Sequence, residues 1–222
     1  MREAVSEALG TALLLYVIVG SGIAAETLMS DPGAQLFAHA IVVGLALGAL
    51  IAMLQTVSGS HFNPSVTLAF WRTGVMSGPT ALRYVAGQIS GAVAGVIAAH
   101  LSFGNQMIAV STTARGTPGT VLAEAIATFV LVLLILGLVR TGHTGSVPAA
   151  VAAWVAAVVF ATSSTGFANP AVTMARALSD TYTGIAPSSV PAFLAAQLIA
   201  GLLAAGAAHV FYPDAARKTT PV

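Results

Sequence analysis

The same short motif occurs twice in this chain, once in each half. Residues 63–67 read Asn-Pro-Ser-Val-Thr, and residues 169–173 read Asn-Pro-Ala-Val-Thr. Two further pairs of segments match in the same order, which are EALGT from Glu7 with EAIAT from Glu124, and YVAGQISGAVAG from Tyr84 with FLAAQLIAGLLAAG from Phe193. The chain is therefore predicted to contain two repeated units, approximately residues 1–115 and 116–222.

The residues between these motifs are too apolar for a water-soluble domain. Hydrophobic residues make up 57% of the chain and charged residues only 7%, whereas soluble domains carry about 25% charged residues. A membrane-spanning helix needs about 20 mainly apolar residues. Six runs meet that length, at 5–27, 35–56, 80–101, 120–140, 147–165 and 190–212. The first is predicted to be a retained span and not a signal peptide, because Glu7 lies inside it and further spans follow.

Each unit contains three spans, so the second unit enters the membrane with the opposite orientation. The predicted fold is an all-α membrane protein with an inverted 3+3 repeat. A cytoplasmic N-terminus would place Arg115 and Arg176 on the far side and the remaining basic residues inside, namely Arg2, Arg72, Arg83, Arg140, Arg217 and Lys218. This distribution follows the positive-inside rule and predicts a multi-pass protein of the plasma (inner) membrane with both termini in the cytoplasm.

The two Asn-Pro motifs predict two short helices that cannot cross the membrane. Asn is a favourable N-cap and Pro is favoured at the first helical position, so the helices would run PSVTLAFWR and PAVTMARAL. The inverted repeat brings their N-termini together near the midplane, where both would repel cations. Irregular backbone at that depth must be buried in protein or line a water-filled path. The candidates to present carbonyl oxygens along this path are Gly59, Ser60, His61, Phe167 and Ala168.

Several classes of function have little support. The chain has no cysteine, which excludes disulfides and thiolate metal sites, and its net charge of +1 offers no surface for nucleic acid. No pair of titratable groups converges with a nucleophile, so we expect no enzymatic activity, no metal site and no cofactor.

At these motifs the sequence resembles the aquaporin, or major intrinsic protein, family. The resemblance rests on Asn63-Pro64-Ser65, on Asn169-Pro170-Ala171, on SGSHFNP before the first motif and on a Glu near the start of spans one and four. It implies one channel domain over 1–222, with six tilted helices and two re-entrant half-helices around a pore, and four protomers in an assembly. It also implies that Glu7 and Glu124 hold loop backbone beside the pore. The alternative for each Glu is a helix-start residue favoured by the helix dipole.

The sequence departs from the family's pattern directly after the second motif. Most members of the family resemble one another in carrying Arg at this position, where it narrows the outer filter of the pore and repels cations, whereas this chain has Val172. The other positions of this filter, counted from each Asn, are Val43, Ala157 or a neighbour, and Gly166. This set is small and apolar, which predicts a wide filter. Val172 resembles a bacterial, arsenic-associated subgroup of aquaglyceroporin-like members, which implies arsenous acid, glycerol-like polyols and water as solutes.

Some alternatives remain open at this point. The chain could be a water-selective aquaporin, or an ion-coupled secondary transporter, since inverted repeats and broken helices also occur in such transporters.

Several other polar residues and glycines have expected positions. Arg176 is expected to point toward the outer vestibule. Gln88 and Gln197 could hydrogen-bond to a loop or only pack between helices. Four histidines are expected at the surface or at helix ends, namely His39, His100, His143 and His209, and six glycines are expected at close helix contacts, namely Gly44, Gly48, Gly87, Gly91, Gly95 and Gly201.

Overall fold

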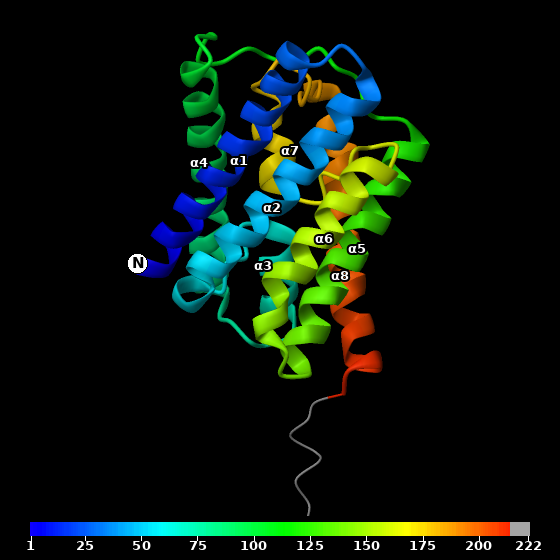
Figure 1. Ribbon diagram of the computed structural model, residues 1–222. Coiled ribbons are helices and arrows are strands. Elements are labelled where there is room, and N and C mark those ends of the chain that lie inside the picture. The colour runs from blue at the N-terminus through cyan, green and yellow to red at the C-terminus, as the bar shows by residue number, and fades with distance from the viewer. Residues whose placement is uncertain (214–222) are drawn as a thin grey trace, which may run out of the picture.

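The computed structural model describes residues 1–213, and Arg217 and Lys218 lie outside the described residues (Figure 1). Every regular element in the described part is helical. The α-helices are α1 (Arg2–Leu28), α2 (Pro32–Ser58), α3 (Pro64–Arg72), α4 (Gly78–Ser102), α5 (Pro118–Arg140), α6 (Val147–Ala161), α7 (Pro170–Arg176) and α8 (Val190–Phe211), with short 3-10 turns η1 (Thr144–Ser146) and η2 (Pro187–Ser189).

The six predicted spans are confirmed. Six of these helices, one counted with η1 and another with η2, are long and apolar enough to cross a membrane. The fifth is shorter than predicted, because α6 ends at Ala161 and Thr162 is already extended, with φ −111° and ψ 148°. The two short helices α3 and α7 begin at Pro64 and Pro170 as expected.

Local sequence explains where the long helices begin. Asp31, Ser77 and Thr117 are the N-caps of α2, α4 and α5, and each side-chain oxygen accepts a hydrogen bond from the backbone N–H three residues further on. Each of these helices also has Pro in its first turn, where the missing N–H costs nothing. The spans are therefore delimited by ordinary capping chemistry.

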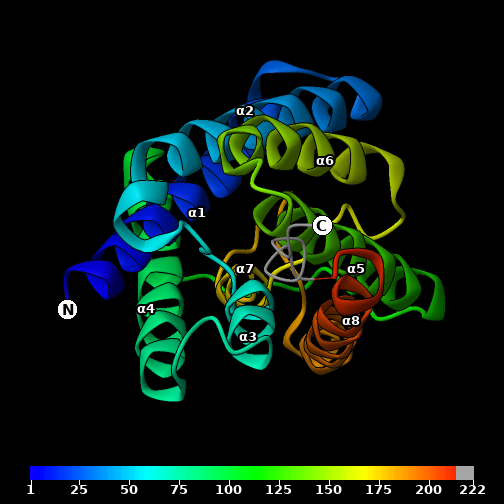
Figure 2. The same ribbon diagram turned by 90° about the horizontal axis from the view of Figure 1, so that it is seen from below.

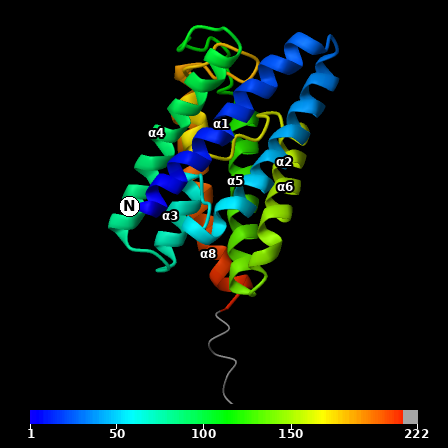
Figure 3. The same cartoon turned by 60° about the vertical axis from the view of Figure 1, so that its left-hand side comes forward.

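The two short helices lie between spans of the two repeats. Seen from below, α3 lies between α4 and α8, α7 lies nearer the middle of the molecule, and α2 runs beside α6 (Figure 2). The spans are tilted relative to one another (Figure 3). Within each repeat the first span packs on the last, α1 on α4 and α5 on α8, while α2 and α6 pack across the repeat boundary.

Glycines allow the spans to approach closely. A Cβ atom built on Gly91 or Gly95 of α4 would lie 2.1 Å from the carbonyl oxygen of Ala8 or Ala12 of α1. On α2, a Cβ at Gly44 would lie 2.7 Å from a backbone oxygen of α6. Helices in membranes associate through such stripes of small residues, and the predicted glycine contacts are confirmed at these positions.

Candidate functional site: a cavity at the two Asn-Pro loops

The two asparagines cap the two short helices. The Oδ1 atom of Asn63 accepts a hydrogen bond from the N–H of Ser65 at 2.9 Å. The Oδ1 atom of Asn169 accepts from Ala171 at 3.0 Å and from Val172 at 3.3 Å. Both asparagines are therefore fixed by their own helices, and their amide groups point away from the helix starts.

The amide groups tie the two repeats to each other. The Nδ2 atom of Asn63 donates to the carbonyl oxygen of Ala168 at 2.7 Å, and that of Asn169 donates to the carbonyl oxygen of Phe62 at 2.8 Å. Each amide has two N–H groups, and this exchange uses one of them. The second N–H of each asparagine amide has no acceptor in these two hydrogen bonds and remains free to donate.

The loops before the asparagines adopt the same unusual backbone conformation. Three residues in each loop have positive φ at matching positions of the repeat, which are Gly59 (84°), Ser60 (52°) and Phe62 (48°) in the first, and Thr165 (60°), Gly166 (52°) and Ala168 (47°) in the second. A residue with a side chain costs roughly 1–3 kcal/mol in such a conformation. The surrounding protein must therefore hold both loops in place.

Glu7 holds the first loop. Its Oε1 atom accepts from the Ser58 hydroxyl at 2.6 Å and from the N–H of His61 at 3.0 Å. Its Oε2 atom accepts from the N–H of Phe62 at 2.6 Å and from Gln88 Nε2 at 2.8 Å. The side chain has no exposed surface. Glu7 therefore accepts four hydrogen bonds, two of which satisfy the loop N–H groups of His61 and Phe62.

Glu124 holds the second loop in the same way. It accepts from the N–H groups of Phe167 and Ala168, both at 2.8 Å, and from Gln197 Nε2 at 2.6 Å. It is also fully buried. The two carboxylates contact loop backbone, as the family resemblance implies.

The two glutamines connect these carboxylates to the short helices. Gln88 Nε2 also donates to Thr67 Oγ1 at 2.9 Å, and Gln197 Nε2 donates to Thr173 Oγ1 at 2.8 Å. Both glutamines therefore make specific polar contacts and do not only pack. The two threonines were not among the predicted site residues, although their recurrence in both motifs was a usable signal.

A cavity of about 500 Å³ passes these loops. It extends from Thr144 and Gly145, before α6, to His39 and Arg176 at what we call the α7 end. Its wall includes most of the predicted residues, namely Asn63, Asn169, Val43, Gly166, Val172, Gly59, Ser60, His61, Phe167 and Ala168. The remaining motif residues lie outside its wall and are buried, namely Pro64, Ser65, Pro170 and Ala171. Among residues 1–213, no cluster of His, Cys, Asp or Glu suited to a metal ion occurs.

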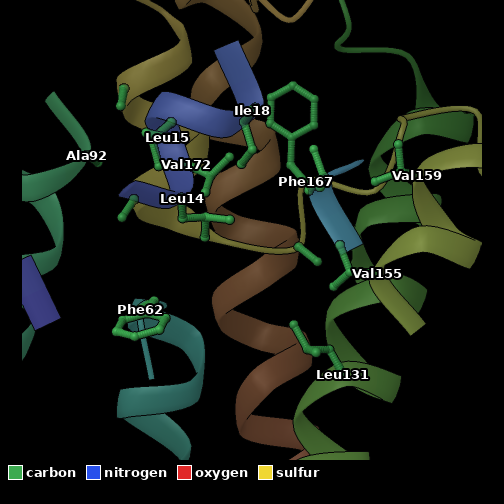
Figure 4. Packing of buried hydrophobic residues seen from close by; sticks show 14 of the residues in the cluster. Leu14, Leu15, Ile18, Phe62, Ala92, Leu131, Val155, Val159, Phe167 and Val172 are labelled. Atoms are coloured by element: carbon green, nitrogen blue, oxygen red, sulfur yellow. The ribbon is translucent and has the colours of Figure 1, made fainter. Parts of the chain in front are cut away.

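The predicted filter position on α6 is Ala157 or a neighbour, and Ala157 itself does not line the cavity. Ala157 is exposed on the outside of α6, whereas Val155 and Val159, two residues away on either side, line the cavity. Positions two apart on a helix point in different directions. In Figure 4, Val155 and Val159 lie across the second loop from Val172.

This corrected assignment can be tested with one pair of variants. Val159→Phe should reduce glycerol flux through reconstituted protein by about tenfold, which corresponds to about 1.4 kcal/mol of added barrier. Ala157→Phe adds the same ring on the lipid side and should leave flux unchanged. Equal losses in both variants, at equal amounts of folded protein, would show that Val159 does not line the conducting path.

His39 differs from expectation, because it is 4% exposed and lines the cavity. Arg176, expected to point toward the outer vestibule, is also 4% exposed and lines the α7 end of the same cavity. His100 lies in the last turn of α4, at a helix end as predicted, and is buried beside Ser179, with Nε2 at 2.8 Å from the hydroxyl. The other two histidines, His143 and His209, are exposed as predicted.

The chain is similar in sequence to known membrane proteins. The sequence profile of the major intrinsic protein family matches residues 1–168. The chain is 40% identical to aquaglyceroporin AqpS of Rhizobium meliloti (strain 1021) over 203 residues, which cover 91% of this chain and 87% of that protein. It is 42% identical to aquaporin A of Dictyostelium discoideum over 90 residues, 40% of this chain and 32% of the relative.

Its backbone is similar to the X-ray structure of the aquaglyceroporin from Plasmodium falciparum. The TM-score is 0.74 over 95% of this chain and 94% of that chain, at 19% sequence identity. The likeness in backbone shows the shared fold, and the sequence matches show common descent. On this evidence the chain belongs to the major intrinsic protein family.

Proposed function

We propose that this protein is a wide passive channel that conducts arsenous acid and glycerol-like polyols, together with water, down their gradients. The coarser function follows from the family: the chain is a membrane channel for water and small solutes such as glycerol, and not an enzyme. The observation that carries the wide pore is Val172, an apolar side chain in the cavity wall directly after the second Asn-Pro-Ala motif.

The cavity wall supports passage of an uncharged, hydroxyl-bearing solute. Val43, Gly166 and Val172 offer no charge and no hydrogen bond from a side chain, so solutes with a carbon or metalloid centre meet little polar resistance there. At the centre, Asn63 and Asn169 each keep one amide N–H that can donate to a solute oxygen. The starts of α3 and α7 add partial positive charge, which disfavours cations.

The relatives support a pore wider than a water-selective one. One relative is an aquaglyceroporin by name. Another, 30% identical over 46% of this chain, is the propanediol uptake facilitator PduF of Citrobacter freundii. These names support small hydroxylated solutes for this channel, and the proposal adds arsenous acid to them.

The contacts of the buried carboxylates disfavour ion-coupled transport. A coupling cation would need free acceptor groups, and Glu7 and Glu124 are the acidic residues that border the loops. Both already accept three or four hydrogen bonds from loop backbone and side chains. A cation at either site would have to displace the contacts that hold the loop.

The setting of the channel is also part of the proposal. Residues 1–222 would act as one channel domain, four copies would form the assembly, and the termini would face the cytoplasm of the cell that makes the protein. The multi-pass membrane location itself follows from the six spans and the family. With this orientation, the α7 end of the cavity faces outward.

The role of Val172 in the filter is tested by placing an arginine at this position. Val172→Arg should reduce glycerol and arsenous acid flux by about tenfold or more and reduce water flux less, because a long cationic side chain narrows the path. Val75→Arg, at a 68% exposed position, adds the same charge outside the cavity and should have no effect. If large solutes pass Val172→Arg at the wild-type rate, the wide-filter proposal is wrong.

A further inference from the structure

A second group of polar residues lines the cavity one helical turn from the apolar filter. Arg176 follows Val172 by four residues on α7, and His39 precedes Val43 by four residues on α2. The end of α7 and the start of α2 lie at the same end of the molecule (Figure 1). Both offsets therefore lead toward the α7 end of the cavity, so a solute that passes Val43 and Val172 also passes His39 and Arg176.

Arg176 is held from its sides and keeps donors for the cavity. Its Nε atom donates to the carbonyl oxygen of Thr183, and its guanidinium carbon lies 3.4 Å from the centre of the Phe167 ring. Among residues 1–213 no carboxylate lies within 4 Å of this guanidinium, and its two terminal nitrogens have no hydrogen-bond partner in the protein. These nitrogens keep some accessible surface, and Arg176 is part of the cavity wall, so we infer that they border the cavity.

His39 supplies a second free polar atom. Its Nδ1 atom lies 2.8 Å from the Ser21 hydroxyl oxygen, and either atom can be the donor in that contact, depending on the tautomer of the ring. Its Nε2 atom has no partner among the described residues, so it can donate to or accept from a hydroxyl group in the cavity.

We propose that Arg176 and His39 form a second, polar constriction that restores to this pore the cation barrier that residue 172 does not provide. The proposal rests on the proposed channel function and adds specificity-determining residues to it. The unpaired guanidinium repels cations along the low-dielectric path. The free donors of Arg176, together with Nε2 of His39, can bind the hydroxyl groups of a neutral solute. Phe167 is a positioning residue, because the guanidinium of Arg176 stacks on its ring.

The barrier is tested in proteoliposomes that report glycerol flux and monovalent cation leak in the same preparation. Arg176→Gln should raise sodium and proton leak by about tenfold, which corresponds to about 1.4 kcal/mol of lost barrier, while glycerol still passes. Arg176→Lys keeps the charge and should stay cation-tight, although it loses the stacking and the contact with Thr183. Arg72→Gln removes an exposed charge on α3, at the far end of the cavity, and should match the wild type.

The outcomes separate this inference from the proposed function. If the wild type conducts glycerol and Arg176→Gln remains cation-tight, the second constriction is wrong and the channel stands. If Lys leaks as much as Gln, Arg176 acts through structure and not through charge, which also contradicts the inference. A wild type without gradient-driven glycerol flux would overturn the channel itself. Should Arg176→Gln fail to fold, Arg176→Met keeps the apolar stem and tests the same loss of charge.

Discussion

Replacing Glu124 by leucine is expected to remove most of the folded, conducting protein. The change leaves the N–H groups of Phe167 and Ala168, and one of the two N–H groups of the Gln197 amide, without an acceptor. Each buried group that loses its partner costs about 1–3 kcal/mol. The loop also carries the strain of the positive φ at Ala168, so its release is favoured once the carboxylate is gone. The measurement is the yield of monodisperse protein in detergent, followed by glycerol flux per folded molecule.

Glu3→Leu is the matched control, because Glu3 is an exposed carboxylate of the first helix. It should fold and conduct like the wild type. Glu124→Gln keeps one acceptor oxygen and should fall between the two. Normal yield and normal flux in Glu124→Leu would show that this carboxylate does not hold the second loop.

Gly91→Ala is expected to destabilise the protein although alanine is the better helix former. The added Cβ would lie 2.1 Å from the carbonyl oxygen of Ala8, which is backbone and cannot turn aside. Helices α1 and α4 must then move apart, at a cost of about 1–3 kcal/mol typical of overpacking. A lower midpoint of thermal unfolding in detergent is the expected result.

Gly206→Ala provides the control for this variant. Gly206 lies in α8, and a Cβ there would meet no atom within 4 Å. The same substitution gains helix propensity of up to about 1 kcal/mol at both positions, so the difference between the variants reports the contact alone. Equal or raised unfolding midpoints in both would contradict the tight packing of α1 on α4.

Sequence reasoning found the elements that repeat. The two Asn-Pro motifs predicted α3 and α7 because capping by Asn and Pro is local chemistry that needs no knowledge of the fold. Glu7 and Glu124 could be singled out because a carboxylate inside an apolar run is costly and needs partners. The partners of these carboxylates came from other helices, and only the fold brings them together.

Sequence reasoning failed in α6, where residue polarity gives no contrast. The segment VPAAVAAWVAAVVFA is apolar throughout, so only residue size separates the cavity face from the outer face. The missed signal is a valine at every fourth position, because Val147, Val151, Val155 and Val159 all line the cavity. Counting residues selected Ala157, which lies between two of these valines. For Arg176 the missing information was tertiary, because Phe167 and Thr183 hold it from two other segments.

The most direct test of the central claim is solute flux through the purified wild-type protein in liposomes without any sodium or proton gradient. The account predicts that glycerol and arsenous acid enter down their own gradients, that uptake rises in proportion to concentration, and that water permeability rises as well. Uptake that saturates at low concentration and requires a proton or sodium gradient would contradict it. Flux of water alone, with glycerol and arsenous acid excluded, would contradict the wide pore.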